Sequence, residues 1–160
     1  MIVPINKPIG WTSFDVVKQV RKITGEKKVG HGGTLDPFAQ GVLVVGIGRN
    51  STRRLNYFSN SNKTYEAKLK LGSETDTLDL TGKIIHEMDI PLLKKDKIKS
   101  IFSEFTGYQE QIPPMFSAKK IRGVRLYKLA RQKKLVQREP IQVFIKLLDL
   151  IDCNSNSINF

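Results

Sequence analysis

The stretch GHGGTLDP at residues 30–37, followed by the apolar run GVLVVGI at residues 41–47, decides how this chain folds. Three glycines in four positions allow close backbone approaches that larger residues resist. Pro37 fixes its own φ and biases Asp36 toward an extended conformation. A carboxylate held this way at the lip of a sheet is a candidate nucleophile. The alternative is that Asp36 caps a turn or the start of a helix, and the loop alone leaves both interpretations open.

The charge of the chain indicates a polyanionic partner. The 160 residues suffice for one domain with a core, or for part of a larger one, and 27 Lys+Arg against 15 Asp+Glu give a net charge of +12. Such a field attracts phosphates, so nucleic acid is the predicted partner, with solubility as the alternative role of the charge.

The number of cysteines and histidines and the hydropathy of the sequence limit which classes of protein this chain can belong to. Cys153 is the only cysteine and there are two histidines, so the sequence predicts no disulfide and no Cys/His zinc site. A reducing, cytoplasmic compartment fits this cysteine usage. No stretch approaches the length of a membrane span, and the N-terminus lacks the features of a signal peptide. We therefore expect no membrane partner.

The first third of the sequence predicts two strands and two helices. Residues 2–5 are typical of a strand, and Thr12 or Ser13 is expected to cap a helix that ends at Gly25. The Val-rich residues 42–47 predict a buried strand, and residues 51–59 a short helix.

The rest of the sequence alternates between strand and helix patterns. Residues 64–71 predict a strand whose Tyr65 faces inward, because apolar and charged side chains alternate there. Further elements are predicted as strands at 83–87 and 140–151, a helix at 94–105, and a strand that begins at 157.

A strongly basic segment interrupts these elements. It begins after the stiff, proline-containing residues 112–118 and holds no acidic residue. Its cations are Lys119, Lys120, Arg122, Arg125, Lys128, Arg131, Lys133, Lys134 and Arg138. Because these charges repel each other without a counter-charge, we expect them to contact the phosphates of RNA or DNA. The alternative is a solvated surface helix.

Five ordered motifs together resemble one protein family. They are KPIGWTS at 7–13, KVGHGGTLDPFAQGVL at 28–43, KTY at 63–65, TDTLD at 75–79 and IPPMFSAKK at 112–120. At this order and spacing the chain resembles the TruB-type tRNA pseudouridine-55 synthases, which isomerise a uridine in the T arm of tRNA. The resemblance favours the catalytic interpretation of Asp36.

The resemblance also implies a fold and a domain organisation. It implies an α+β fold with a mixed, largely antiparallel sheet and flanking helices. Residues 1–160 are expected to form the N-terminal portion of the catalytic domain, with a basic, RNA-gripping insertion at about 112–138. The C-terminal part is expected to be absent, since the family's Lys-Gly-Thr-Tyr-Ile-Arg-like run does not occur here.

Residue roles follow from the same resemblance. Asp36 corresponds to the catalytic aspartate, Tyr65 to the tyrosine that stacks on the target uracil, and His31 to the histidine of the RNA-contacting loop. The T stem-loop is expected to be gripped by the segment that includes Lys119, Lys120, Arg122 and Arg125. The target nucleotide is expected to flip out of the loop, and the reaction to need no cofactor and no metal. We expect a cytoplasmic monomer.

Two other functions compete with the enzyme. One is a catalytically incomplete fragment that still binds tRNA, favoured by the missing C-terminal motif. The other is a nucleotide-binding α/β enzyme, indicated by VVGIGR at 44–49, which has only the first two glycines of a dinucleotide fingerprint.

Overall fold

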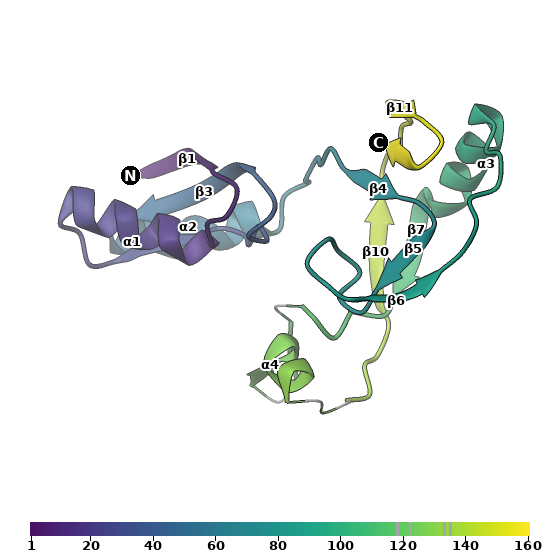
Figure 1. The fold of residues 1–160 in the computed structure, drawn as a ribbon. Coiled ribbons are helices and arrows are strands. Elements are labelled where there is room, and N and C mark those ends of the chain that lie inside the picture. The colour runs from purple at the N-terminus through teal and green to yellow at the C-terminus, as the bar shows by residue number, and fades with distance from the viewer. Residues whose placement is uncertain (118, 122, 133, 135) are drawn as a thin grey trace. The chain divides into compact units, whose positions relative to one another are not determined.

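The chain folds into two compact units, Met1–Thr64 and Tyr65–Phe160, each of which is described here by itself (Figure 1). The computed structural model describes residues 1–117, 119–121, 123–132, 134 and 136–160. Within these residues helices accompany antiparallel strand ladders, so the predicted α+β class with flanking helices is confirmed.

The first unit is a three-stranded antiparallel sheet with two helices. Its strands lie in the order β1-β3-β2. The elements are β1 (Ile2–Lys7), α1 (Ser13–Thr24), β2 (Val29–His31), β3 (Gly41–Ile47) and α2 (Arg49–Ser59). Each of the four elements predicted in this region is therefore present.

The two helices cover opposite faces of this sheet. Leu43 and Val45 of β3 pack with Val17 and its apolar neighbours on α1 in the buried core. Successive strand residues point to opposite faces, so Gly46 faces the other way, toward α2. A Cβ at Gly46 would lie 3.1 Å from the backbone carbonyl of Ser51, which explains why glycine is needed where the helix approaches.

Helix α1 begins and ends where the sequence predicts. The Thr12 hydroxyl accepts the Asp15 N–H at 3.1 Å, and the Asp15 carboxylate accepts the Thr12 N–H at 3.0 Å, which completes a capping box. The Thr12 hydroxyl and N–H, with Lys18, lower the pKa of Asp15 to about 2. Gly25 takes a left-handed φ of 68° and ends the helix.

Among its described residues, the second unit contains four small antiparallel sheets rather than one continuous sheet. Strands lie in the orders β11-β12-β4, β10-β7, β5-β6 and β8-β9. The elements are β4 (Lys68–Lys70), β5 (Ser73–Thr75), β6 (Ile84–Glu87), α3 (Lys95–Phe105), β7 (Gly107–Gln111), β8 (Lys120–Ile121), β9 (Val124–Arg125), α4 (Leu126–Arg131), β10 (Ile141–Ile145), β11 (Asp152–Cys153) and β12 (Ser157–Asn159).

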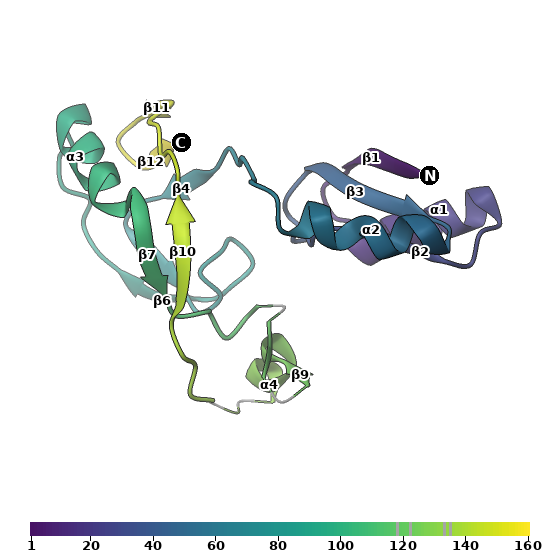
Figure 2. The ribbon, with the colours of Figure 1, turned by 180° about the vertical axis from the view of Figure 1, so that it is seen from behind.

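Aromatic contacts tie parts of this unit together. Figure 2 shows β10 beside β7, and their facing residues Tyr108 and Phe144 place their ring centroids 4.9 Å apart. The Phe102 ring on α3 lies 5.5 Å from that of Phe160, after β12. These contacts connect segments that lie far apart in the sequence.

The predicted strand at 64–71 is much shorter than expected, and the inward orientation of Tyr65 is wrong. Only Lys68–Lys70 form β4, and Tyr65 lies outside it with 66% of its surface exposed. Beside the β4–β12 ladder, Ala67 and Phe160 exchange two backbone hydrogen bonds, at 2.8 and 3.0 Å. The alternating pattern of apolar and charged residues is therefore longer than the strand that the structure shows.

Candidate active site and nucleic-acid interface

The Asp36 loop connects two neighbouring strands of the first unit. Strands β2 and β3 pair with His31 opposite Val45, and the connection between them carries Asp36. The carbonyl of Asp36 accepts the Ala39 N–H at 3.1 Å, which forms a turn. The side chain of Asp36 is exposed, and no described residue donates a hydrogen bond to its carboxylate. The carboxylate is thus open to a ligand.

Hydrogen bonds hold the backbone on both sides of Asp36. The Ser13 hydroxyl accepts the Leu35 N–H at 3.0 Å and donates to the Leu35 carbonyl at 3.2 Å. On the other side, the Gly10 N–H donates to the Pro37 carbonyl at 2.7 Å. We call these three bonds the loop clamp. The clamp fixes where the Asp36 carboxylate emerges from the first unit.

A buried lysine supports the segment that supplies the clamp. Lys7 is fully buried, and its ammonium group donates to the carbonyls of Pro8 at 3.0 Å and Trp11 at 2.7 Å. A buried charge is tolerated only when hydrogen bonds replace its hydration. The lysine therefore closes the turn at residues 8–11, in which Gly10 takes a left-handed φ of 85°.

The sequence did not identify Ser13 as a site residue. It predicted only a role in capping the helix, whereas Thr12 is the cap and Ser13 is buried against the loop. The available signal was the co-occurrence of the 7–13 and 28–43 motifs. That signal could not show which side chain joins them, because Ser13 and Leu35 are 22 positions apart.

His31 lies at the end of β2, at the start of the same loop. Its ring is half-buried, and Nδ1–H donates to the Gly33 carbonyl oxygen. A carbonyl oxygen can only accept, so Nδ1 is the donor in this contact. The structure thus places His31 and Asp36 in one loop region, and their proposed roles stay predictions.

Tyr65 is the first residue of the second unit. The residue is 66% exposed. Its proposed contact with uracil stays a prediction.

The basic segment contains a short hairpin and a helix. Strand β8 pairs with β9, with Lys120 opposite Arg125. Leu126 is fully buried, whereas Lys119 and Arg125 are exposed, so the apolar side chain anchors the segment and these cations remain accessible. The predicted contact residue Arg122 lies outside the described residues.

The nucleotide-binding interpretation of residues 44–49 is wrong. A dinucleotide fingerprint requires a parallel βαβ unit, whereas β3 is antiparallel to both of its neighbours. Gly46 instead allows the close approach of α2, and Gly48 adopts a left-handed φ of 86° immediately before that helix.

The described residues hold neither a metal-binding cluster nor a membrane-spanning helix. No three His, Cys, Asp or Glu side chains gather there in a way that could hold a metal ion. No helix in this part of the chain has both the length and the apolar composition needed to cross a membrane.

Two solved structures share this fold. One, described as a Cbf5-Nop10-Gar1 complex, aligns with a TM-score of 0.69 at 25% identity and covers 99% of this chain and 37% of that chain. Another is described as an H/ACA RNP bound to a substrate RNA containing 2'-deoxyuridine, and aligns with a TM-score of 0.62 at 23% identity, covering 99% of this chain and 35% of that chain. This chain therefore shares its fold with a chain in each of these solved structures.

The comparison with family models identifies the family of this chain. The family model described as TruB family pseudouridylate synthase (N terminal domain) matches residues 21–160. The chain belongs to the TruB family, and the resemblance stated from its motifs is confirmed.

Relatives named tRNA pseudouridine synthase B are similar along almost the whole chain. The protein from Protochlamydia amoebophila is 48% identical over 160 residues, which are 99% of this chain and 60% of that protein. The protein from Geobacter sulfurreducens is 50% identical over 150 residues, which are 92% of this chain and 49% of that protein. The chain thus spans about half to three fifths of the length of these relatives.

Proposed function

We propose that this chain belongs to an enzyme that converts a uridine in the T arm of tRNA to pseudouridine, with Asp36 as the catalytic carboxylate. The observation that carries the proposal is the loop clamp, which holds Leu35 and Pro37 while the Asp36 side chain stays exposed. Membership of the TruB family and the names of the relatives support it.

The reaction places defined demands on the site. The bond between N1 of uracil and C1' of ribose breaks and a bond between C5 and C1' forms, while C5 loses its proton through a base to solvent and N1 takes up a proton. No net oxidation occurs, so a positioned carboxylate and a proton acceptor suffice without a cofactor. Asp36 supplies the carboxylate, which acts beside the sugar and the base.

The target base must leave the folded RNA before it can react. Flipping costs a few kcal/mol, and stacking on an aromatic side chain recovers about 1–3 kcal/mol. Tyr65 is proposed to provide that surface, and its exposed ring is compatible with stacking. His31 is proposed to contact the RNA loop from the start of the Asp36 loop.

The basic segment is proposed to grip the T stem-loop. Lys119, Lys120, Arg122 and Arg125 are the proposed contacts. Neutralising Lys119, Lys120 and Arg122 together is expected to weaken tRNA binding and flatten its salt dependence by up to about three slope units, one for each phosphate that no longer has a cationic partner. Binding isotherms at several salt concentrations test this, and an unchanged slope would place the contacts elsewhere.

A second candidate function is tRNA binding without turnover. It is favoured by the chain's coverage of only 60% and 49% of its relatives. A T-arm hairpin containing 5-tritiated uridine separates the two functions, because isomerisation releases the tritium. Release by this chain supports the enzyme; tight binding without release, together with release by the full-length protein, supports the binding fragment. No release by either protein would contradict the proposed reaction.

The proposal also covers the oligomeric state and the cellular location of the protein. The protein is proposed to act as a cytoplasmic monomer. Light scattering of the tRNA complex, with one protein copy for each tRNA as the expected result, tests the monomeric state.

A further inference from the structure

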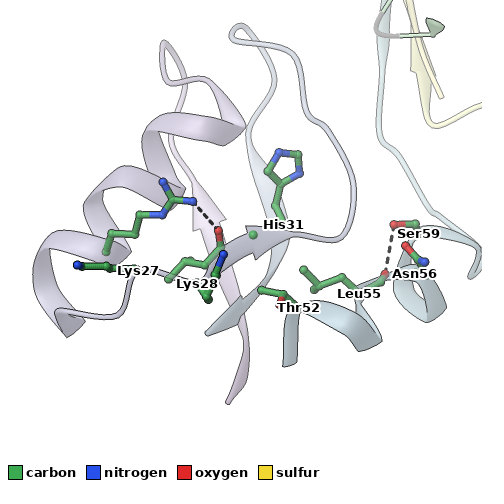
Figure 3. Close-up of a pocket in the computed structure, with 10 residues that line it drawn as sticks. Lys27, Lys28, His31, Thr52, Leu55, Asn56 and Ser59 are labelled. Atoms are coloured by element: carbon green, nitrogen blue, oxygen red, sulfur yellow. Dashed lines mark hydrogen bonds between the residues drawn. The ribbon is translucent and has the colours of Figure 1, made fainter. Parts of the chain in front are cut away.

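A hollow of about 400 Å³ opens in the first unit, between the end of α1, strand β2 and helix α2 (Figure 3). Three of its lining residues are cations, namely Arg21, Lys27 and Lys28. Thr52 and Asn56 of α2 add neutral polar groups, and no carboxylate from the described residues lines the hollow. This composition favours an anionic occupant.

Arg21 is held in place before any ligand binds. Its Nη2 donates to the Val29 carbonyl at 3.0 Å. Its Cζ lies 5.7 Å from the ring centroid of Phe14, within reach of a cation–π contact. Because both contacts fix the planar guanidinium, little rotational freedom is lost when it binds a further group.

One donor of this guanidinium lacks an acceptor. Nε of Arg21 is buried and has no hydrogen-bond partner among the described residues. Leaving a buried donor unpaired is unfavourable, and most such groups in proteins are paired. A phosphate oxygen is a suitable acceptor, since guanidinium groups bind phosphate through parallel N–H donors.

Among the described residues, the acidic side chain next to the two lysines in the sequence forms no ion pair with either of them. Oε1 of Glu26 accepts the backbone N–H of Lys28 at 2.8 Å, so the carboxylate is engaged with the main chain. The side chains of Lys27 and Lys28 are exposed. Their ammonium groups therefore remain accessible to an incoming anion.

We propose that this hollow binds a backbone phosphate of the RNA, as a contact separate from the basic segment at about 112–138. The proposal rests on the proposed function, since it takes the RNA substrate as the source of the phosphate. His31 also lines the hollow, so a strand that reaches His31 passes the three cations. The hollow thus helps to set the path of the RNA toward the Asp36 loop.

The RNA arm of the test compares two doubly neutralised variants of the full chain. K27A/K28A removes both lysines of the hollow, whereas the matched control R53A/R54A removes two exposed cations of α2 that do not line it. Affinity for a T-arm hairpin is measured at several salt concentrations. K27A/K28A is expected to weaken binding roughly tenfold and to lower the salt slope by about 1, for the one phosphate held in the hollow, with a smaller effect in the control. An unchanged slope, or an equal effect in R53A/R54A, overturns the proposal.

A phosphate arm separates this proposal from the proposed function. Inorganic phosphate is titrated into the wild-type chain while the Nε–H resonance of Arg21 is followed by NMR, with sodium chloride at matched ionic strength as the control. A saturable shift with phosphate alone, absent in K27A/K28A, supports the hollow as a phosphate site even if the protein forms no pseudouridine. No shift overturns the site, and a shift without any change in the RNA salt slope overturns the assignment to RNA.

Discussion

Replacing Ser13 with alanine is expected to release the Asp36 loop while leaving the fold intact. The Ser13 hydroxyl is buried and makes two of the three bonds in the loop clamp, both to Leu35. Alanine keeps the helix propensity of this position and removes only the oxygen. The perturbation therefore acts on the loop more than on helix α1.

The free-energy cost of Ser13→Ala follows from the two hydrogen bonds to Leu35 that it removes. A hydrogen bond contributes about 0.5–1.5 kcal/mol net, so the loss of two costs about 2 kcal/mol. At about 1.4 kcal/mol for each factor of ten, the loop opens roughly 30-fold more often. A displacement of the carboxylate by about 1 Å can lower the rate of the chemical step on the order of 100-fold.

Amide hydrogen exchange measures this opening without any need for turnover. Exchange at Leu35 and Gly10, both of which donate within the clamp, is expected to accelerate roughly 30-fold in Ser13→Ala. The matched control is Ser51→Ala, which removes another buried serine hydroxyl of the first unit, bonded to the amino group of Met1 at 2.7 Å. Unchanged exchange in Ser13→Ala, or equal acceleration in Ser51→Ala, would refute the clamp.

Three further changes test packing, capping and the basic segment. Gly46→Ala is expected to destabilise the chain by about 1–3 kcal/mol in urea unfolding, because its Cβ would lie 3.1 Å from the Ser51 backbone; Gly30→Ala, with a 3.4 Å contact to a side chain, should cost less. The pKa of Asp15 is lowered from 3.8 to about 2, so its contribution to the free energy of unfolding is complete above pH 3.8 and is lost as the pH falls toward 2. Asp15→Asn should therefore make the free energy of unfolding less dependent on pH in that range. An unchanged pH profile would contradict this prediction. Leu126→Ala deletes a fully buried side chain and should cost about 2–5 kcal/mol, measured as faster amide exchange in α4; unaltered exchange would show that Leu126 does not anchor the basic segment.

The sequence predicted the first unit well because its signals are local. The Thr12 and Asp15 pair and Gly25 define the ends of α1 through neighbours in the chain. The apolar residues of β3 were recognised from composition and length alone, and the structure places the strand at Gly41–Ile47. Such features depend on few residues and need no knowledge of distant partners.

The second unit shows where local signals are insufficient. The alternation at residues 64–71 was correct as a pattern, but β4 extends only as far as β12 pairs with it. Tyr65 therefore lies outside the strand, and its predicted inward orientation was wrong. Pairing between segments nearly ninety positions apart leaves no signal in either segment by itself, as the Leu69–Ile158 pair illustrates.

The candidate site shows the same difference between local motifs and non-local contacts. Asp36 and His31 were identified from a motif and lie in one loop region, whereas Ser13 was missed because its contact with Leu35 is non-local. The sequence also did not predict the hollow between α1, β2 and α2. Its lining residues come from α1, β2, α2 and the connection between α1 and β2, and only the structure brings these segments together.

The most direct test of the account is pseudouridine formation by the full-length protein on unmodified tRNA, with Asp36 and with Asp36→Asn. The substitution is nearly isosteric, so tRNA affinity is expected to stay within a few-fold while pseudouridine becomes undetectable by nucleoside mass spectrometry after chemical derivatisation. Equal amounts of pseudouridine from both proteins would contradict the catalytic role of the Asp36 carboxylate.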